Sequence, residues 1–304
     1  MEVENVDAVV MWGTNARNTH PIYFHHVLKG IDNGARSWTI DPRRTATARF
    51  TDTWLGLNVG TDIGLAHGVA REIISAGLTD DEFISNATTG YGEFVAFVEP
   101  WTLEHTAEVT GVSAEAIRDL AHGYATAPTA QICWTLGITE HHTGVDNVLS
   151  LCNLALLTGH VGRWGSGLVP LRGQNNVQGG GDMGALPNKL SGFQDVEDDE
   201  IRAKFEAAWD CEIPPTNGWN LTQMFEAMER DELKAVYIIG ENPADSEADV
   251  KHARAMLERL DVMVVQDVFM TRTARMADVV LPAALGWAES DGTVTNSERR
   301  VQRM

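Results

Sequence analysis

Cysteine is scarce in this sequence, and long apolar runs are missing. The 304 residues include three cysteines, Cys133, Cys152 and Cys211, and none of them belongs to a CxxC pair. We therefore expect reduced cysteines in the core, and neither a disulfide framework nor a cluster site. No apolar run approaches the ~18 residues of a membrane span, and no leader pattern opens the chain. These absences predict a cytoplasmic protein without a membrane segment.

Positive charge is the second shortage. Lys and Arg number 23 against 43 Asp and Glu, which gives a formal net charge of -20. Nucleic acids and anionic membranes are bound by clustered Lys and Arg, so this excess of acid argues against both as partners. An acidic surface is also typical of adaptation to high salt, because screening relieves the repulsion between carboxylates. We expect a halophilic protein, with an ordinary acidic protein as the alternative.

The common motifs of nucleotide, hydrolase and zinc sites are missing as well. No predicted strand runs into a GxGxxG or a P-loop motif, and the chain has no GxSxG. The histidine pairs His25-His26 and His141-His142 have no third ligand at the spacing of a zinc site. We therefore predict no metal ligand in this chain.

What the sequence does contain is an alternation of strand and helix patterns. Asp7–Trp12 and Arg36–Ile40 are predicted strands, and the helix between them runs from Pro21 to about Gly34. This alternation is typical of parallel βαβ units, and it returns in the last third of the chain. Other predicted strands are Gln131–Leu136, Ala235–Ile239, Val262–Val265 and Val279–Leu281, and other predicted helices are 63–76, 113–127, Val145–Leu157, Leu221–Arg230 and Ala248–Leu260.

One spaced pattern occurs twice. The pattern D-x5-T-A-R-x2-D lies at Asp41–Asp52 and again at Asp267–Asp278. A G-x-N triplet after a predicted strand comes before each copy, at Gly13–Asn15 and Gly240–Asn242. The repeat predicts an internal duplication, with a ligand crevice at the carboxyl ends of the strands in each unit. For any single position, an ordinary turn residue is the alternative.

The stretch Leu171–Asn188, LRGQNNVQGGGDMGALPN, has neither helical nor strand periodicity. It contains five glycines, several side-chain amides and one arginine. A loop of this length inside a folded protein is usually functional or disordered.

This loop also carries a family resemblance. Arg172–Gly179 and Asp182–Pro187 closely resemble a loop of the molybdenum- or tungsten-dependent formate dehydrogenases, which belong to the wider molybdopterin oxidoreductase (dimethyl sulfoxide reductase) superfamily. The resemblance runs the length of the chain. It is also carried by Trp12–Asn15, His20-Pro21, Asp41–Arg43, Asn58–Gly60, Trp134–Thr139, Asn153–Gly159, Gly240–Pro243, Gln266-Asp267, Met270-Thr271, Thr273-Ala274 and Asn296–Gln302.

The resemblance implies an α/β fold of two Rossmann-like parallel-sheet units, the second incomplete. Each unit would grip one of two pyranopterin guanosine dinucleotides that chelate molybdenum or tungsten. The first unit would span 1–172, the second 173–280, and 281–304 would begin a following segment. The implied cofactor-binding residues are Asn15, Asp41, Arg43, Gly60 and Asp62 in the first unit, Gly240, Glu241, Asn242, Gln266, Asp267 and Thr271 in the second, and Gln174 and Asn175 in the loop.

Arg172 is the catalytic residue that the resemblance implies. Its guanidinium would pair with the formate carboxylate, since the two groups have matching planar geometry. The whole protein would oxidise formate to carbon dioxide and pass electrons through iron–sulfur clusters to a partner subunit or domain.

The family's N-terminal 4Fe-4S cluster and its Cys or Sec metal ligand have no counterpart here, so we expect a central fragment that is inactive alone. Another superfamily enzyme, such as an assimilatory nitrate reductase, and a metal-free scaffold of the same fold stay open as alternatives.

Overall fold

The computed structural model describes residues 1–286, 289, 291–296 and 300–303. The chain divides into two units, Met1–Gly173 and Gln174–Met304, and each is described by itself. The Asn296–Gln302 motif is only partly described, because residues 297–299 lie outside the described residues.

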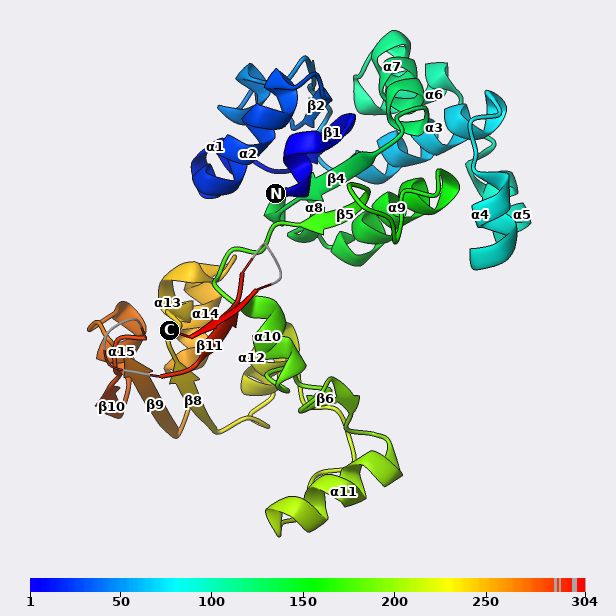
Figure 1. Cartoon of the computed structure of the whole chain (residues 1–304). Helices are drawn as coiled ribbons and strands as arrows, with labels where there is room; N and C mark the ends of the chain where they lie inside the picture. Colours follow the sequence, from blue (N-terminus) through cyan, green and yellow to red (C-terminus); the bar gives the residue numbers. More distant parts are fainter. Residues whose placement is uncertain (287–288, 290, 297–299, 304) are drawn as a thin grey trace. The chain divides into compact units, whose positions relative to one another are not determined.

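Unit 1 is built on a five-stranded parallel sheet with the strand order β3-β2-β1-β4-β5. Figure 1 labels β1, β2, β4 and β5 of this sheet. Its central strand is buried on both faces: Val10 packs into one hydrophobic core and Met11 into the other. A continuous apolar strand suits a parallel sheet that helices cover on both sides. The strands are β1 (Ala8–Trp12), β2 (Arg36–Ile40), β3 (Thr53–Leu55), β4 (Ala130–Trp134) and β5 (Gly167–Pro170).

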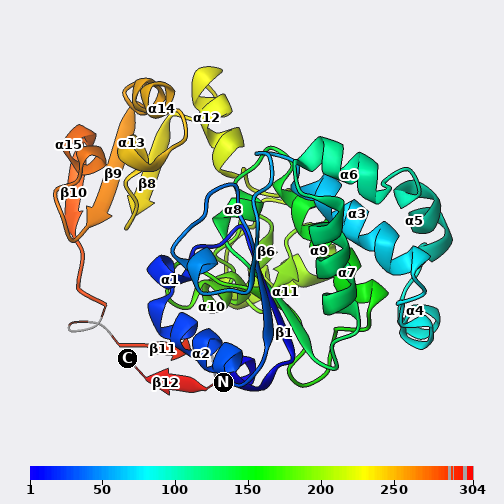
Figure 2. The same cartoon turned by 90° about the horizontal axis from the view of Figure 1, so that it is seen from above.

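Helices cover both faces of this sheet (Figure 2). Leu65 of α3, Leu120 of α7 and Leu154 of α9 fill the larger core, and Phe24 of α2 belongs to the smaller one. The helices of unit 1 are α1 (Ala16–Thr19), α2 (Pro21–Asp32), α3 (Asp62–Ser75), α4 (Asp81–Ala87), α5 (Tyr91–Val98), α6 (Leu103–Thr110), α7 (Ala114–Ala125), α8 (Leu136–Thr139), α9 (Gly144–Leu157) and the 3-10 helices η1 (Glu2–Asn5) and η2 (Thr47–Arg49).

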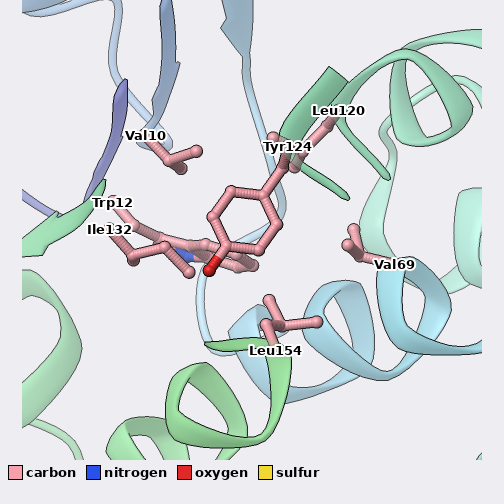
Figure 3. Close-up of a pocket in the computed structure, with 7 residues that line it drawn as sticks. All are labelled: Val10, Trp12, Val69, Leu120, Tyr124, Ile132 and Leu154. Atoms are coloured by element: carbon pink, nitrogen blue, oxygen red, sulfur yellow. The ribbon is translucent and has the colours of Figure 1, made fainter. Parts of the chain in front are cut away.

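The larger core holds a small apolar cavity beside Trp12 (Figure 3). Its volume is about 10 Å³, and its walls come from β1, β4, α3, α7 and α9. The Tyr124 hydroxyl is fully buried there, and burial raises the pKa of this phenol. This hydroxyl therefore belongs to the core and not to a solvent-facing site.

Unit 2 contains a three-stranded parallel sheet with the order β10-β9-β8. Phe225 of α12 and Met256 of α14 pack with Val265 against one face. The other face exposes apolar side chains, with Tyr237 55% and Ile239 63% exposed. These elements are α12 (Leu221–Glu229), β8 (Ala235–Ile239), α13 (Pro243–Ser246), α14 (Val250–Leu257), β9 (Val262–Asp267), α15 (Arg272–Met276) and β10 (Val279–Pro282).

Smaller elements complete unit 2. Leu190, Val196 and Phe205 form a separate small core. In the described part of unit 2, two antiparallel pairs, β6 with β7 and β11 with β12, make up the remaining strands. The bounds are α10 (Val177–Asp182), β6 (Lys189–Leu190), β7 (Gln194–Asp195), α11 (Asp199–Trp209), β11 (Thr293–Thr295) and β12 (Val301–Arg303).

The predicted α/β class with parallel sheets is confirmed. The expected strand Gln131–Leu136 was too long, since β4 ends at Trp134 and Leu136 already begins α8. The glycine-rich loop is not a loop throughout: Val177–Asp182 forms α10. Three glycines give this helix low intrinsic propensity and no apolar stripe, so no periodicity marked it.

The cysteines and the helices can be compared with the predictions of reduced core cysteines and of no membrane segment. Cys133 is a buried core residue as expected, whereas Cys211 is exposed, so the prediction of a core cysteine was wrong there. Among the described residues, none of the helices has both the length and the apolar character that crossing a bilayer requires.

Candidate functional site

The carboxyl end of the unit 1 sheet brings together the loops that follow β1 and β4. The strand order reverses between these two strands, and such a switch point is where open α/β sheets bind ligands. Gly13 has a φ of 59°, and its carbonyl oxygen accepts a 3.1 Å hydrogen bond from the Gly137 N–H. A Cβ on Gly13 would lie 2.7 Å from the carbonyl carbon of Gly137. Only glycine fits this backbone contact.

Asn15 closes the turn after β1. Its Oδ1 accepts hydrogen bonds from the Thr47 N–H at 3.3 Å and from the Thr47 hydroxyl at 3.2 Å. The Thr47 Oγ1 in turn accepts from the Arg17 N–H at 3.0 Å. The side-chain oxygen of Asn15 therefore joins the turn to η2.

Asp41 follows β2 and is 8% exposed. Its Oδ1 accepts a 2.8 Å hydrogen bond from the Arg43 N–H, and its main-chain oxygen accepts one of 2.8 Å from the Trp54 indole. The Arg43 side chain is exposed. Among the described residues, no hydrogen bond is made to the second carboxylate oxygen of Asp41 or by the guanidinium of Arg43, so both stay candidates for contact with a ligand.

Asp62 is the first residue of α3 and is 8% exposed. Its Oδ1 accepts a 2.8 Å hydrogen bond from the Trp12 indole. Burial raises the pKa of Asp62, while the Trp12 hydrogen bond and the charge of His141 lower it. One carboxylate oxygen of Asp62 therefore serves as the acceptor for a buried indole N–H of the protein itself.

Arg172 follows β5, and its backbone is held on two sides. The preceding Leu171 N–H donates to the Trp134 carbonyl at 2.9 Å, and the Arg172 carbonyl oxygen lies 2.6 Å from Nε2 of His20. The Arg172 side chain is exposed, and no carboxylate within the part of the chain that the structure describes pairs with its guanidinium. The guanidinium fork is therefore free to meet a ligand at the end of the strand.

Unit 2 repeats the hydrogen bonds of unit 1 at the spacing of the sequence pattern. Asn242 Oδ1 accepts from the Thr273 N–H at 3.2 Å and hydroxyl at 2.8 Å, as Asn15 does from Thr47. Gly240 has a φ of 66°, and its N–H donates to Gln266 at 2.9 Å; the Gly13 N–H donates to Ile40 at the same distance.

The last aspartate of each pattern also has one role. The Asp52 and Asp278 carboxylates each accept a 2.8 Å bond from a backbone N–H, that of Ser37 in β2 and that of Met263 in β9. Residues at matching positions of the repeated pattern therefore form matching hydrogen bonds in the two units.

The side chains of three other unit 2 candidates form hydrogen bonds within the unit. Asp267 Oδ1 accepts from the Phe269 N–H at 3.0 Å, and Thr271 caps α15 by accepting from the Ala274 N–H at 3.1 Å. Gln266 accepts a hydrogen bond from the Tyr237 hydroxyl.

Glu241 lines a pocket of about 420 Å³ between α12 and β8. Glu247 lines the same pocket, and burial together with the charge of Glu241 raises the pKa of Glu247.

Three candidates have open surroundings. Gly60 has a φ of 82°, and a Cβ placed there would meet no atom within 4 Å. Gln174 and Asn175 are exposed at the start of unit 2. Over the described ranges, no cluster of three or more His, Cys, Asp or Glu side chains could hold a metal ion.

Sequence reasoning missed three contributors to these sites. Trp12 and Thr47 lie within sequence motifs, but these motifs do not predict that the two side chains bind Asp62 and Asn15. The His20-Pro21 motif does not predict the contact between His20 and the carbonyl of Arg172, which lies 152 residues later in the chain. The repeat pattern was a signal for Thr47; nothing local marked Trp12 or His20 as partners.

Comparison with known proteins gives a family match over the whole chain. Residues 1–304 match the model of the molybdopterin oxidoreductase family. The chain is 44% identical over 301 residues to the F420-dependent formate dehydrogenase subunit alpha of Methanocaldococcus jannaschii, covering 99% of this chain and 44% of that protein. It is 41% identical over 303 residues to formate dehydrogenase H of Escherichia coli, covering 99% of this chain and 42% of that protein.

Among solved structures, acetylene hydratase from Pelobacter acetylenicus superimposes with a TM-score of 0.75 at 24% identity. The match covers 97% of this chain and 43% of that one. This likeness supports the fold alone. The chain spans less than half the length of each of these relatives.

Proposed function

Because the chain belongs to the molybdopterin oxidoreductase family, we propose that it is part of the catalytic subunit of a formate dehydrogenase, which oxidises formate to carbon dioxide. Identities of 41–44% to formate dehydrogenase alpha subunits support this choice within the family. The activity belongs to the whole protein, since this chain spans 42–44% of those subunits.

The observation that carries the proposal is the state of Arg172. Its backbone is fixed at the carboxyl end of β5, and its exposed guanidinium has no carboxylate partner among the described side chains. A guanidinium binds a carboxylate through two parallel hydrogen bonds and stays protonated at any working pH. Arg172 would therefore orient formate and neutralise its charge before the reaction starts.

The strand ends fit a large nucleotide-bearing cofactor. The Thr14 hydroxyl, in the turn after β1, is 1% exposed, and no described residue forms a hydrogen bond with it. Gly60 and Gly240 have positive φ values and open space where a Cβ would be, so a ligand can approach their backbone. These features suit a pyrophosphate and its flanking groups at the carboxyl ends of the strands.

We assign one pyranopterin guanosine dinucleotide to each unit. When bound, the molybdenum or tungsten centre supplies the redox chemistry, and an iron–sulfur partner of the whole protein completes the electron path. The residues of this chain hold and orient the cofactor. They are Asn15, Asp41, Arg43, Gly60 and Asp62 in unit 1, and Gln174, Asn175, Gly240, Glu241, Asn242, Gln266, Asp267 and Thr271 in unit 2.

The test is an Arg172→Lys change in the full-length enzyme, measured as formate-dependent dye reduction. We expect kcat/KM for formate to fall about 100-fold, because a lysine keeps the charge and loses the two-point geometry. Arg230→Lys is the control, since Arg230 pairs with Glu232 before β8, away from the strand ends. Unchanged formate turnover in Arg172→Lys, or reduction of nitrate in place of formate oxidation, would contradict the proposal.

A second assay tests the cofactor. We expect the full-length protein, denatured, to release guanine nucleotide and molybdenum or tungsten in a ratio near two nucleotides to one metal. A protein that releases neither would be a metal-free scaffold.

A further inference from the structure

His20 connects two parts of unit 1 that lie far apart in the sequence. It ends the short helix α1 and directly precedes Pro21, the first residue of α2. Its Nε2 lies 2.6 Å from the carbonyl oxygen of Arg172, 152 residues later in the chain. The histidine therefore ties the turn after β1 to the residue that follows β5.

The chemistry of the two atoms fixes the direction of this bond. A carbonyl oxygen only accepts, so Nε2 of His20 donates the proton. The Thr19 hydroxyl lies 2.9 Å from Nδ1 of His20 and 3.3 Å from the Asn15 carbonyl oxygen. It can donate to the neutral ring, or accept from the protonated ring and donate to Asn15. The bond to Arg172 thus persists in both charge states of the histidine.

We propose that His20 is a positioning residue for the Arg172 guanidinium, an inference that rests on the proposed function. Two hydrogen bonds hold the backbone at Arg172: the Leu171 N–H to Trp134, and the His20 ring to the Arg172 carbonyl. Removing the histidine therefore leaves the Leu171 hydrogen bond without the one that holds the Arg172 carbonyl.

The equivalent position in unit 2 shows that the histidine is not needed to build the fold. Counting from the repeated asparagines, Glu247 follows α13 as His20 follows α1. An ionised glutamate cannot donate to a carbonyl, and Glu247 instead lines the pocket beside β8. The same strand–turn–helix forms with either residue, so this turn does not itself require the histidine.

The test uses His20→Asn in the full-length enzyme with its cofactor. Asparagine suits the position before a helix, but its side chain is too short to reach the Arg172 carbonyl. We expect KM for formate to rise about tenfold while kcat changes less than about threefold, because carboxylate binding is what loosens. His20→Gln, whose longer amide can donate to the same carbonyl, should restore most of the affinity. His25→Asn, on an exposed position of α2, should behave as wild type.

Hydrogen exchange gives a readout that needs no substrate. Amides in peptides covering Gly167–Gly173 should exchange faster in His20→Asn than in wild type, and His20→Gln should reverse the change. Unchanged exchange together with an unchanged KM would overturn the role of His20. If the variants change hydrogen exchange as expected but the wild-type enzyme does not oxidise formate, the proposed function fails. The role of His20 in holding the backbone at Arg172 then still stands.

Discussion

Asp62 shows how one buried side chain can serve the fold and lie at the site. Its carboxylate is 8% exposed at the start of α3 and accepts the Trp12 indole hydrogen 2.8 Å away. A carboxylate in this position stabilises the helix start and satisfies a buried donor. The cost is desolvation, which is the largest influence on its pKa and raises it.

This cost gives a pH prediction for Asp62→Asn. Because the folded pKa is raised above 3.8, the unfolded chain loses this proton first, and folding loses stability as pH rises from 3.8 through the folded value. Asparagine keeps an oxygen for Trp12 and carries no charge. We expect its melting temperature to exceed that of wild type at pH 7, and the difference to vanish below pH 3.8.

Asp62→Ala is the matched control for that series. It removes the charge but leaves the buried Trp12 N–H without an acceptor, which costs about 1–3 kcal/mol. Melting curves at pH 7 and pH 3.5 for both variants separate the two effects. A lower melting temperature for Asp62→Asn than for wild type at pH 7 would contradict the prediction.

At the scale of elements, the turn after β1 is set by backbone contact. Gly13 combines a φ of 59° with a backbone neighbour, the Gly137 carbonyl carbon, 2.7 Å from a Cβ placed there. Gly60 has a φ of 82° and no such neighbour. An alanine at Gly13 would therefore suffer both backbone strain and a steric clash, whereas an alanine at Gly60 would suffer backbone strain alone.

We expect Gly13→Ala to lower the free energy of unfolding by about 2–5 kcal/mol, the sum of left-handed strain and overpacking. Gly60→Ala should cost about 1–2 kcal/mol, from strain alone. Urea unfolding of both variants measures the difference. Equal losses would show that the contact between the loops after β1 and β4 yields easily.

The corresponding turns of the two units are also set by specific contacts, in this case hydrogen bonds. Asn15 and Asn242 each place a side-chain oxygen on the N–H and hydroxyl of a threonine that lies at the start of a short helical segment. A threonine at this point is bonded and buried in both units, Thr47 and Thr273 each being 0% exposed. The spacing in the sequence thus reflects a hydrogen-bond requirement of the turn.

At the scale of the whole molecule, the excess of negative charge is the main influence that we expect on the salt dependence of stability. With 43 acidic against 23 basic residues, the folded chain repels itself at low ionic strength. Raising salt shortens the screening length from about 10 Å at 0.1 M to about 3 Å at 1 M. We expect the melting temperature to rise by several degrees between 0.1 M and 2 M KCl.

The control for this prediction is a neutral solute, such as glycerol, at the same osmolality. A gain that KCl gives and glycerol does not comes from charge screening. A melting temperature that stays flat or falls with KCl would mean that the acidic composition is not an adaptation to salt.

The sequence by itself determined the parallel α/β class, the positions of most strands and the repeated turn residues. These features are local: apolar runs of strand length, turn residues and fixed spacing depend on neighbours along the chain. It also made Arg172 a candidate, through its loop. It missed α10, because a helix with three glycines has no periodic signal.

Only the tertiary structure decided the partners. Trp12 meets Asp62 across 50 residues, and His20 meets Arg172 across 152. Each pair joins segments at the carboxyl edge of the parallel sheet, where the end of β1 meets the start of α3 and the turn after α1 meets the residue that follows β5. Spacing along the chain carries no record of that adjacency, since it arises from strand order and helix packing and not from any local pattern.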